Sequence, residues 1–174
     1  LERLKSKATV ILVGDTIDAL QRLGYWARKK TTAKVIGITG SNGKTTTKEF
    51  SAAILEGFKS VHYSKGSFNN HWGVPFTLLQ LAPEKDVAVV ELGMNHSGEI
   101  TNLMRIVEPD IVCCTMVGRA HIEHFGTIEK IAAAKEEIYE AASAKATRIY
   151  NLDNPLTAKM YQGAAQKFPL SRLI

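Results

Sequence analysis

The sequence contains few cysteines and no long apolar run. Its two cysteines, Cys113 and Cys114, are neighbours in an apolar stretch. Neighbouring residues of a strand point to opposite faces, so we expect no disulfide between them and interpret both as reduced core residues of a cytoplasmic protein. No stretch approaches the ~20 apolar residues of a membrane helix, and residues 1–7 lack the pattern of a signal peptide. We therefore expect no membrane insertion.

Positively charged residues outnumber negatively charged ones by only a small margin. Of the 174 residues, 45% are hydrophobic and 22% are charged, which is typical of a soluble globular domain. The formal net charge of +5 is compatible with an anionic partner. However, the basic residues are scattered and form no stripe, so we predict no nucleic-acid binding. We also expect the protein to be a monomer.

Apolar stretches alternate along the chain with segments of helical periodicity. The predicted strands cover residues 10–13, 35–39, 86–92, 111–117 and 147–151, and the predicted helices cover 16–27, 44–58, 76–81, 98–106 and 128–144. Asp15 or Thr16 is expected to cap the first helix and Thr127 the last. In the second helix, Phe50, Ala53, Ile54 and Gly57 recur at helical spacing and are expected to form its apolar face. Because the strands are continuous apolar runs, we predict an α/β fold with a doubly wound, mostly parallel sheet covered by helices on both faces.

The most specific local pattern is a glycine loop between a predicted strand and a predicted helix. It reads Thr-Gly-Ser-Asn-Gly-Lys-Thr-Thr over residues 39–46, and its predicted phosphate-binding residues are Gly40, Ser41, Asn42, Gly43, Lys44, Thr45 and Thr46. Glycines let backbone N–H groups surround phosphate oxygens, while the lysine reaches the β and γ phosphates and the following threonine binds Mg²⁺. The strict pattern requires glycine where Ile38 stands, so a purely structural glycine turn remains an alternative.

Two charged residues stand in apolar surroundings. Glu91 ends a Val-rich strand at the edge where ligands bind in open α/β sheets, although a local hydrogen bond would also explain it. Lys135 falls on one helical stripe with Ile128, Ile131, Ile138 and Ala142. A lysine on this face loses solvation, which favours the neutral, nucleophilic amine. The alternative is a lysine that reaches water from the edge of the stripe.

Several further motifs follow the glycine loop in a fixed order. They are Asn-Asn-His-Trp-Gly-Val-Pro-Phe-Thr-Leu-Leu at 69–79, Glu-Leu-Gly-Met at 91–94, Gly-Glu-Ile at 98–100, Ala-His-Ile-Glu at 120–123, Phe-Gly at 125–126 and Ala-Lys-Glu-Glu-Ile at 134–138. Over about residues 10–155, this set resembles the Mur ligase superfamily. Within this superfamily, these motifs are most similar to those of the ligases that add D-alanyl-D-alanine to UDP-N-acetylmuramoyl-tripeptide, a UDP-linked muramoyl peptide.

The resemblance implies an ATP-dependent ligase of peptidoglycan precursor synthesis that works through an acyl phosphate. It implies that Thr45 and Glu91 hold one Mg²⁺, that His121 binds a second, and that Asn70 reaches the substrate. The alternatives are a packed or solvated histidine at His121 and tight-turn chemistry at Asn70. The matching lysine of the family is carbamylated by CO₂, which implies a carbamate on Lys135. The catalytic residues would then be Lys44, Lys135 and His121. Met116 and Arg119 depart from the Asn and Pro that are common in the family, which puts any contact of that Asn in doubt.

The resemblance also implies a domain organisation. Residues 1–33 correspond to the tail of an N-terminal UDP-substrate domain and a linker, and residues 34–174 to an incomplete central ATP-binding domain. The basic composition of residues 28–34 by itself also predicts a linker near this boundary. The adenine contacts and the C-terminal domain would lie outside these residues, so we expect no catalysis by this piece alone. Two alternatives stay open. One is a ligase of the folylpolyglutamate or cyanophycin synthetase type, and the other is a nucleotide-binding module without catalysis.

Overall fold

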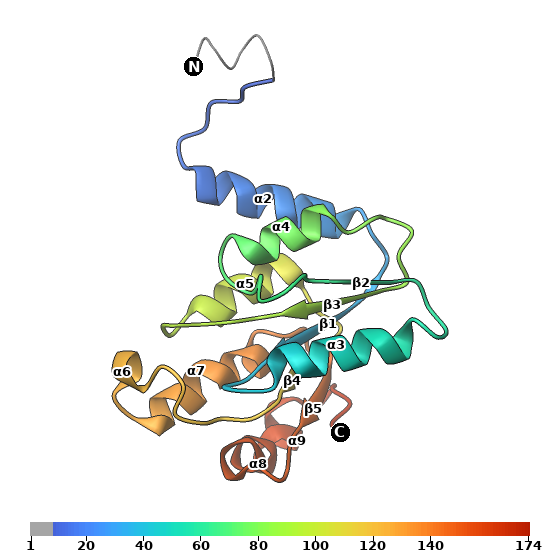
Figure 1. The fold of residues 1–174 in the computed structure, drawn as a ribbon. Helices are drawn as coiled ribbons and strands as arrows, with labels where there is room; N and C mark the ends of the chain where they lie inside the picture. The colour runs from blue at the N-terminus through green and yellow to red at the C-terminus, as the bar shows by residue number, and fades with distance from the viewer. Residues whose placement is uncertain (1–8) are drawn as a thin grey trace.

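A parallel sheet forms the centre of residues 9–174, the part of the chain that the computed structural model describes (Figure 1). Its five strands are β1 (Lys34–Thr39), β2 (Val61–Tyr63), β3 (Val87–Glu91), β4 (Ile111–Cys114) and β5 (Thr147–Tyr150), in the order β2-β3-β1-β4-β5. Every pairing is parallel. The strand order reverses beside β1, between β1 and β4, which is the position where ligands bind in sheets of this kind.

Helices cover both faces of the sheet. They are α2 (Thr16–Lys29), α3 (Lys44–Leu55), α4 (Gly73–Leu79), α5 (Glu99–Val107), α6 (Ile122–Phe125), α7 (Ile128–Glu140), α8 (Pro155–Gln162) and α9 (Ala164–Lys167). The larger core lies between the sheet and α4, α5 and α7, and α3 closes a smaller core over β1, β2 and β3. Figure 1 shows α3 on one side of the sheet and α4 and α5 on the other, with α2 lying outside them. The predicted α/β fold with a mostly parallel sheet is confirmed.

Side chains cap three helices at the positions that sequence favours. Asp15 accepts a hydrogen bond from the backbone N–H of Asp18 at 2.6 Å, and Thr127 accepts one from Lys130 at 3.3 Å, as predicted. At the end of the chain, Asn154 caps α8, which begins with a proline in its first turn. Residues 152–154 form a turn after β5, and the chain enters α8 directly from it.

Two predictions about the apolar pattern were wrong. Residues 10–13 form no strand, because they pair with no other segment of the described chain, and Ile11 is 78% exposed. In α3, Phe50 and Ile54 are 67% and 65% exposed, whereas Lys48 and Ala52 are buried. The small Ala52 faces the sheet, and the Lys48 ammonium donates to backbone carbonyls inside the protein. The fixed start of α3 at the glycine loop, rather than its amphipathic pattern, sets which face is buried.

The segments around α2 and α4 also differ from the prediction. The helix predicted over 76–81 begins earlier, at Gly73, because Pro75 is tolerated in the first turn. Residues 28–34 are not an isolated linker, since α2 extends to Lys29 and Arg28 donates to the carbonyl of Val107 at 2.8 Å. Helix α2 is therefore fastened to the body of the domain.

The cysteines behave as the sequence predicted. Cys113 and Cys114 form no disulfide; Cys114 is buried and Cys113 half-buried. Burial raises the pKa of the Cys113 thiol to about 11 and that of Cys114 to about 12, so both stay protonated and unreactive near neutral pH. Within residues 9–174, no helix combines the length and the apolar character needed to cross a membrane.

Arg148 in β5 fixes the end of α7 from inside the core. Its side chain is among the largest that are fully buried, at 1% exposure. The guanidinium donates to the backbone carbonyls of Tyr139, Ala142, Ser143 and Ala146, which lie at or just after the end of the helix. These carbonyls have no partner within the helix, and the positive charge also suits the negative end of the helix dipole.

We predict that Arg148→Ala lowers the free energy of unfolding by about 3 kcal/mol, because it leaves several buried carbonyls unpaired and opens a cavity. Urea denaturation of the purified chain would measure this change. The control is Arg22→Ala, which removes a side chain that is 81% exposed and forms an ion pair with Asp18 on the same helix. A change above ~0.5 kcal/mol is not expected for the control. Equal stability of the two variants would contradict the proposed role of Arg148.

Candidate active site

The glycine loop lies between β1 and α3, as the sequence predicted. Gly40 has φ 145° and Gly43 has φ 80°, which are conformations that residues with side chains rarely adopt. The first helical hydrogen bond runs from the N–H of Thr47 to the carbonyl of Gly43 at 2.8 Å. The preceding N–H groups of the first turn have no acceptor within the helix and can bind an anion. Lys44 is folded over the loop, with its ammonium 2.9 Å from the carbonyl of Gly40.

The loop after β4 braces the glycine loop, a contact that sequence analysis missed. Ser41 donates its N–H to the carbonyl of Met116 at 2.8 Å, and its hydroxyl is within hydrogen-bond distance of both backbone groups of Gly118. Thr115 donates its hydroxyl to the carbonyls of Asn42 and Thr39. Two segments separated by more than seventy residues therefore hold one another in place.

Met116 was singled out because asparagine is common there in the family. In the structure, its backbone carbonyl makes the bond to Ser41, so this contact does not depend on the side chain. Asn151 and Asn154, to which sequence gave no role, hold the same loop from the other side. Asn151 donates to the carbonyl of Thr115 at 2.7 Å, and Asn154 bonds both backbone groups of Val117.

Glu91 is fully buried at the end of β3 beside the glycine loop. Thr45 donates its hydroxyl to one carboxylate oxygen, Oε2, at 2.9 Å, so the two predicted metal ligands lie together. The amide of Asn69 donates to the other oxygen, Oε1, at 2.7 Å. These bonds satisfy a charge that would otherwise be costly to bury. Asn69 was missed as a site residue, although it stands directly before the predicted Asn70.

Asn70 has a structural contact of its own. Its side-chain oxygen accepts a hydrogen bond from the N–H of Gly73 at 2.9 Å, which is the tight-turn chemistry that the sequence left open. Asn70 nevertheless also lines a cleft of about 440 Å³ that opens above the glycine loop. The two interpretations of Asn70 are therefore compatible.

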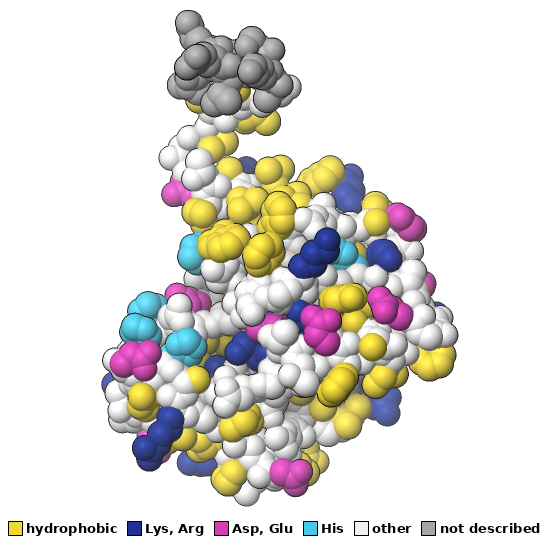
Figure 2. Space-filling model, viewed as in Figure 1, with side chains coloured by type: hydrophobic (Ala, Val, Ile, Leu, Met, Phe, Trp, Pro, Cys, Tyr) yellow, Lys and Arg dark blue, Asp and Glu magenta, His cyan; other side chains and the backbone are white. Residues whose placement is uncertain are grey.

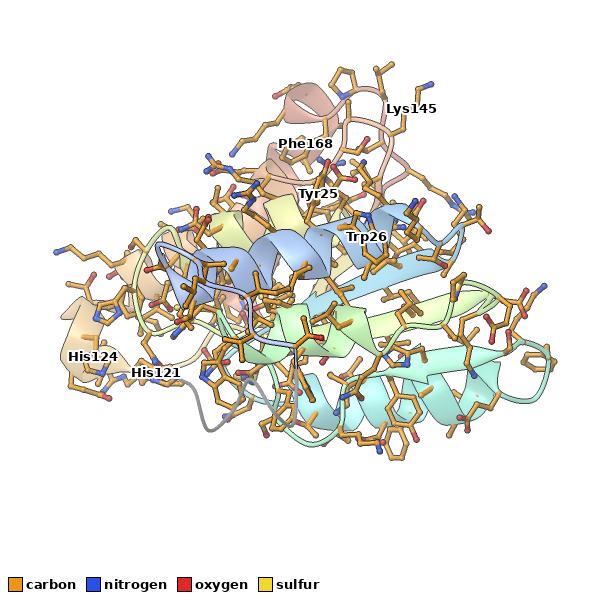
Figure 3. The ribbon with its side chains drawn as sticks, turned by 90° about the horizontal axis from the view of Figure 1, so that it is seen from above. Tyr25, Trp26, His121, His124, Lys145 and Phe168 are labelled. Carbon is orange, nitrogen blue, oxygen red and sulfur yellow. The ribbon has the colours of Figure 1, made fainter. Side chains whose placement is uncertain are left out.

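This cleft brings together Lys44, Asn70, His121 and Lys135, which are far apart in the sequence. His121 lies just before α6 with φ 62°, and its ring is stacked on that of His124, with centroids 6.4 Å apart. Figure 3 shows both rings at one end of the domain, and Figure 2 shows histidine and acidic side chains gathered on this side. Within residues 9–174, no three His, Cys, Asp or Glu side chains are grouped so that they could hold a metal ion by themselves.

Lys135 is 2% exposed on the inner face of α7, between the fully buried Ile131 and Ile138. The predicted placement on the apolar stripe is confirmed. Burial lowers the pKa of its ammonium to about 8, and the nearby charge of Lys44 acts in the same direction, while Cys114 opposes it. A substantial fraction of neutral amine is therefore present slightly above neutral pH.

Glu137, in the helical turn that follows Lys135, ties α7 to α5. Its carboxylate accepts hydrogen bonds from the N–H groups of Gly98 and Thr101, at 2.6 and 3.0 Å. A carboxylate at the N-terminus of a helix satisfies N–H groups that have no other partner and suits the helix dipole. Helix α7 is thereby fixed at the cleft, which limits how far Lys135 can move.

The chain is similar to known proteins in both sequence and structure. Residues 38–171 match the Mur ligase middle domain. The UDP-N-acetylmuramoyl-tripeptide--D-alanyl-D-alanine ligase of Bacillus subtilis is 43% identical over 152 residues, which are 87% of this chain and 33% of that protein. A crystal structure of MurF from Acinetobacter baumannii has a TM-score of 0.86 at 36% identity and covers 94% of this chain and 36% of its own. The MurF ligase from Thermotoga maritima, in complex with ADP, has a TM-score of 0.80 at 29% identity, with 97% and 39% covered.

The central strand, the glycine loop and the cleft above it define an α/β domain of the phosphate-loop type. More particularly, the chain belongs to the Mur ligase family. It spans about a third of the length of the relatives that it matches.

We predict that Lys135 titrates with a midpoint near pH 8 in the folded chain. Because this pKa lies below the ordinary value of 10.5, the folded state binds fewer protons than the unfolded chain between these two pH values. The free energy of unfolding contributed by this group should therefore rise by about 3 kcal/mol as the pH increases through that window. The rise should be absent in Lys135→Met.

Chemical denaturation between pH 7 and 10.5 would measure this difference, and NMR of ¹³C-methylated lysines would report the midpoint directly. Lys130→Met is the matched control, since Lys130 is an exposed residue of the same helix. A parallel pH dependence of the wild type and Lys135→Met would show that the lysine keeps its ordinary pKa.

Proposed function

We propose that this chain is the ATP-binding part of a ligase that joins D-alanyl-D-alanine to UDP-N-acetylmuramoyl-tripeptide. The observation that carries the proposal is the single cleft in which the phosphate-loop lysine, Lys44, meets His121 and the buried Lys135. A module that only binds nucleotide needs the first of these residues but neither of the others. The name and the 43% identity of the Bacillus subtilis ligase support the choice of substrates.

The proposed reaction joins a carboxylate to an amine. The carboxylate oxygen of the tripeptide attacks the γ-phosphorus of ATP, which forms an acyl phosphate and releases ADP. The amine of the dipeptide then attacks the acyl carbon, loses a proton and expels inorganic phosphate. Charge builds up on the transferred phosphoryl group, so the site needs positive charge and N–H donors more than it needs an acid or a base. The N–H groups of residues 40–46 would hold the phosphates, and the Lys44 ammonium would move from Gly40 to their oxygens.

The residues present also fit Mg²⁺. A hydroxyl and a carboxylate are the hard oxygen ligands that this ion prefers, and Thr45 and Glu91 already lie within 2.9 Å of one another. Mg²⁺ bound there would neutralise charge on the phosphates. His121, which also lines the cleft, would supply a nitrogen ligand for a second ion.

Lys135 would act through a carbamate. A neutral lysine amine adds to CO₂ and loses a proton, and its lowered pKa makes the neutral form accessible. The carbamate turns a buried cation into an anion, which Lys44 across the cleft and the second Mg²⁺ would stabilise. The new carboxylate would help to orient the reacting groups.

Other parts of the proposal rest on the family. Residues 1–33 would connect to a preceding UDP-substrate domain, and the adenine and the incoming dipeptide would be bound outside residues 34–174. Asn70 would contact the substrate from the edge of the cleft. We also propose that the enzyme is a monomer in the cytoplasm, where ATP and nucleotide-linked precursors are available. Phosphate release by the full-length ligase with muramoyl peptide, folate or cyanophycin substrates would distinguish it from its relatives.

We predict that Lys44→Ala lowers the turnover of the full-length ligase by a factor on the order of 10² to 10³, because it removes charge that stabilises the transition state. Release of phosphate at saturating ATP would be measured. Lys59→Ala, at an exposed position after α3, should leave turnover unchanged. Normal turnover of the Lys44 variant would exclude the assignment of the phosphate loop.

We further predict that Lys135→Ala abolishes most activity and that acetate restores part of it, because the acid occupies the vacated position of the carbamate. Acetamide, which has a similar size but no charge, should not restore activity. ¹³C NMR of the wild-type ligase with ¹³CO₂ should show a carbamate signal that is missing in the variant. If acetate and acetamide act alike, or if the variant keeps near-normal turnover, the lysine contributes only packing.

A further inference from the structure

We propose that Asn69 is a positioning residue that orients the Glu91 carboxylate for the metal ion. This inference rests on the proposed function and extends it to a residue that the sequence did not indicate. Its basis is a chain of contacts that starts at the carboxylate and ends on α3, the helix that also carries Thr45.

The Glu91 carboxylate is held at both of its oxygens. Glu91 is fully buried, so hydrogen bonds within the protein replace the water that it would otherwise bind. Asn69 donates from Nδ2 to Oε1 at 2.7 Å, and Thr45 donates from its hydroxyl to Oε2 at 2.9 Å. With one oxygen held on each side, the carboxylate cannot rotate without breaking a bond. Oε2 is therefore kept toward Thr45, where the metal ion is expected.

Backbone contacts orient the Asn69 side chain. The backbone carbonyl of Asn69 accepts a hydrogen bond from the N–H of Gly93 at 2.8 Å, so Asn69 is fastened to the chain just beyond Glu91. The amide passes closely over Gly93, where an added methyl group would lie 2.6 Å from Oδ1. The absence of a side chain at Gly93 is therefore what allows the amide to reach Glu91.

The loop that carries Asn69 is in turn fastened to α3. Lys48 is fully buried, and its ammonium donates to the carbonyls of Ser64 and Gly66, each at 2.7 Å. Lys48 and Thr45 lie one turn apart on α3. The helix thus holds Glu91 directly through Thr45 and indirectly through Lys48, the loop and Asn69. Both hydrogen-bond partners of the Glu91 carboxylate are therefore positioned by the same helix, α3, which begins at the phosphate loop.

Loss of Asn69 should therefore affect binding of the metal ion more than binding of the nucleotide. Asn69 makes no contact with residues 40–46 among the hydrogen bonds of the described chain, so its loss should leave metal-free nucleotide binding intact. It should weaken the contribution of Mg²⁺, because the carboxylate would then be free to adopt other orientations. A residue needed only for folding would instead lower both.

The experiment measures binding of ADP to the full-length ligase by calorimetry, once with Mg²⁺ and once with EDTA. We expect Asn69→Ala to reduce the gain in affinity due to Mg²⁺ by about tenfold, while the affinity in EDTA stays close to the wild-type value. The melting temperature should fall somewhat in both conditions, because the buried Glu91 carboxylate loses a hydrogen-bond partner. Electron paramagnetic resonance of Mn²⁺ should show a matching loss of metal affinity. Asn102→Ala, at an exposed position of α5, is the control and should change neither quantity.

Two further variants test whether the orientation of the Glu91 carboxylate is what matters. Asn69→Asp preserves the shape of the side chain but places a second carboxylate next to Oε1, so its loss of metal affinity should be at least as large. Gly93→Ala leaves Asn69 unchanged but displaces its amide, and should reproduce the effect. An unchanged Mg²⁺ contribution in the Asn69 variants, with normal binding by the wild type, would overturn this inference alone. A wild-type ligase that gains no affinity from Mg²⁺ would overturn the proposed function as well.

Discussion

All five strands run in the same direction, and this constraint decides where chemistry can take place in the domain. The carboxyl ends of parallel strands meet at one edge, so the residues that end β1, β3 and β4 are brought together there. Thr39, Glu91 and Cys114 end these strands, and the glycine loop, the loop of Gly93 and the loop of Thr115 follow them. The first two strands lead to the glycine loop and to Glu91, to which we assign phosphate and metal binding in the proposed function. The third of these strands, β4, leads to the loop of Thr115, whose hydrogen bonds hold the glycine loop in place.

The domain also shows a competition between stability and reactivity on α7. A fully apolar residue at position 135 would pack well between Ile131 and Ile138, whereas a lysine there loses its hydration. Burial of Lys135 therefore destabilises the folded protein near neutral pH, and the same effect creates a neutral amine. Neighbouring contacts offset this loss of stability. Glu137 fixes α7 to α5, and Arg148 satisfies the carbonyls at its end, so the helix tolerates an unfavourable residue at its centre.

The sequence predicted those features that are encoded within one segment. The strands around β1 and β3 were recognisable as apolar runs, the caps at Asp15 and Thr127 from local chemistry, and the burial of Lys135 from helical spacing. The contacts of Asn69 and Thr115 were not predictable in this way. They are polar bonds between segments that are 22 and 73 residues apart, and no periodic pattern marks them. The strand expected at 10–13 was wrong for a related reason, because a strand needs a partner that its own sequence does not specify.

Helix α3 shows why a hydrophobic pattern can point the wrong way. Its first turn is fixed by the glycine loop, since Thr45 has to reach Glu91 and Lys44 has to lie over Gly40. Residues that follow at helical spacing must then face the interior, and these include Lys48. The aromatic side of the helix is consequently turned to the outside of the described domain. A lysine is tolerated in the interior because its ammonium donates to two backbone carbonyls and lies 3.1 Å from the Glu49 carboxylate. The side of the helix that carries Lys48 is therefore the buried side. In this helix, the geometry of the site outweighs amphipathicity.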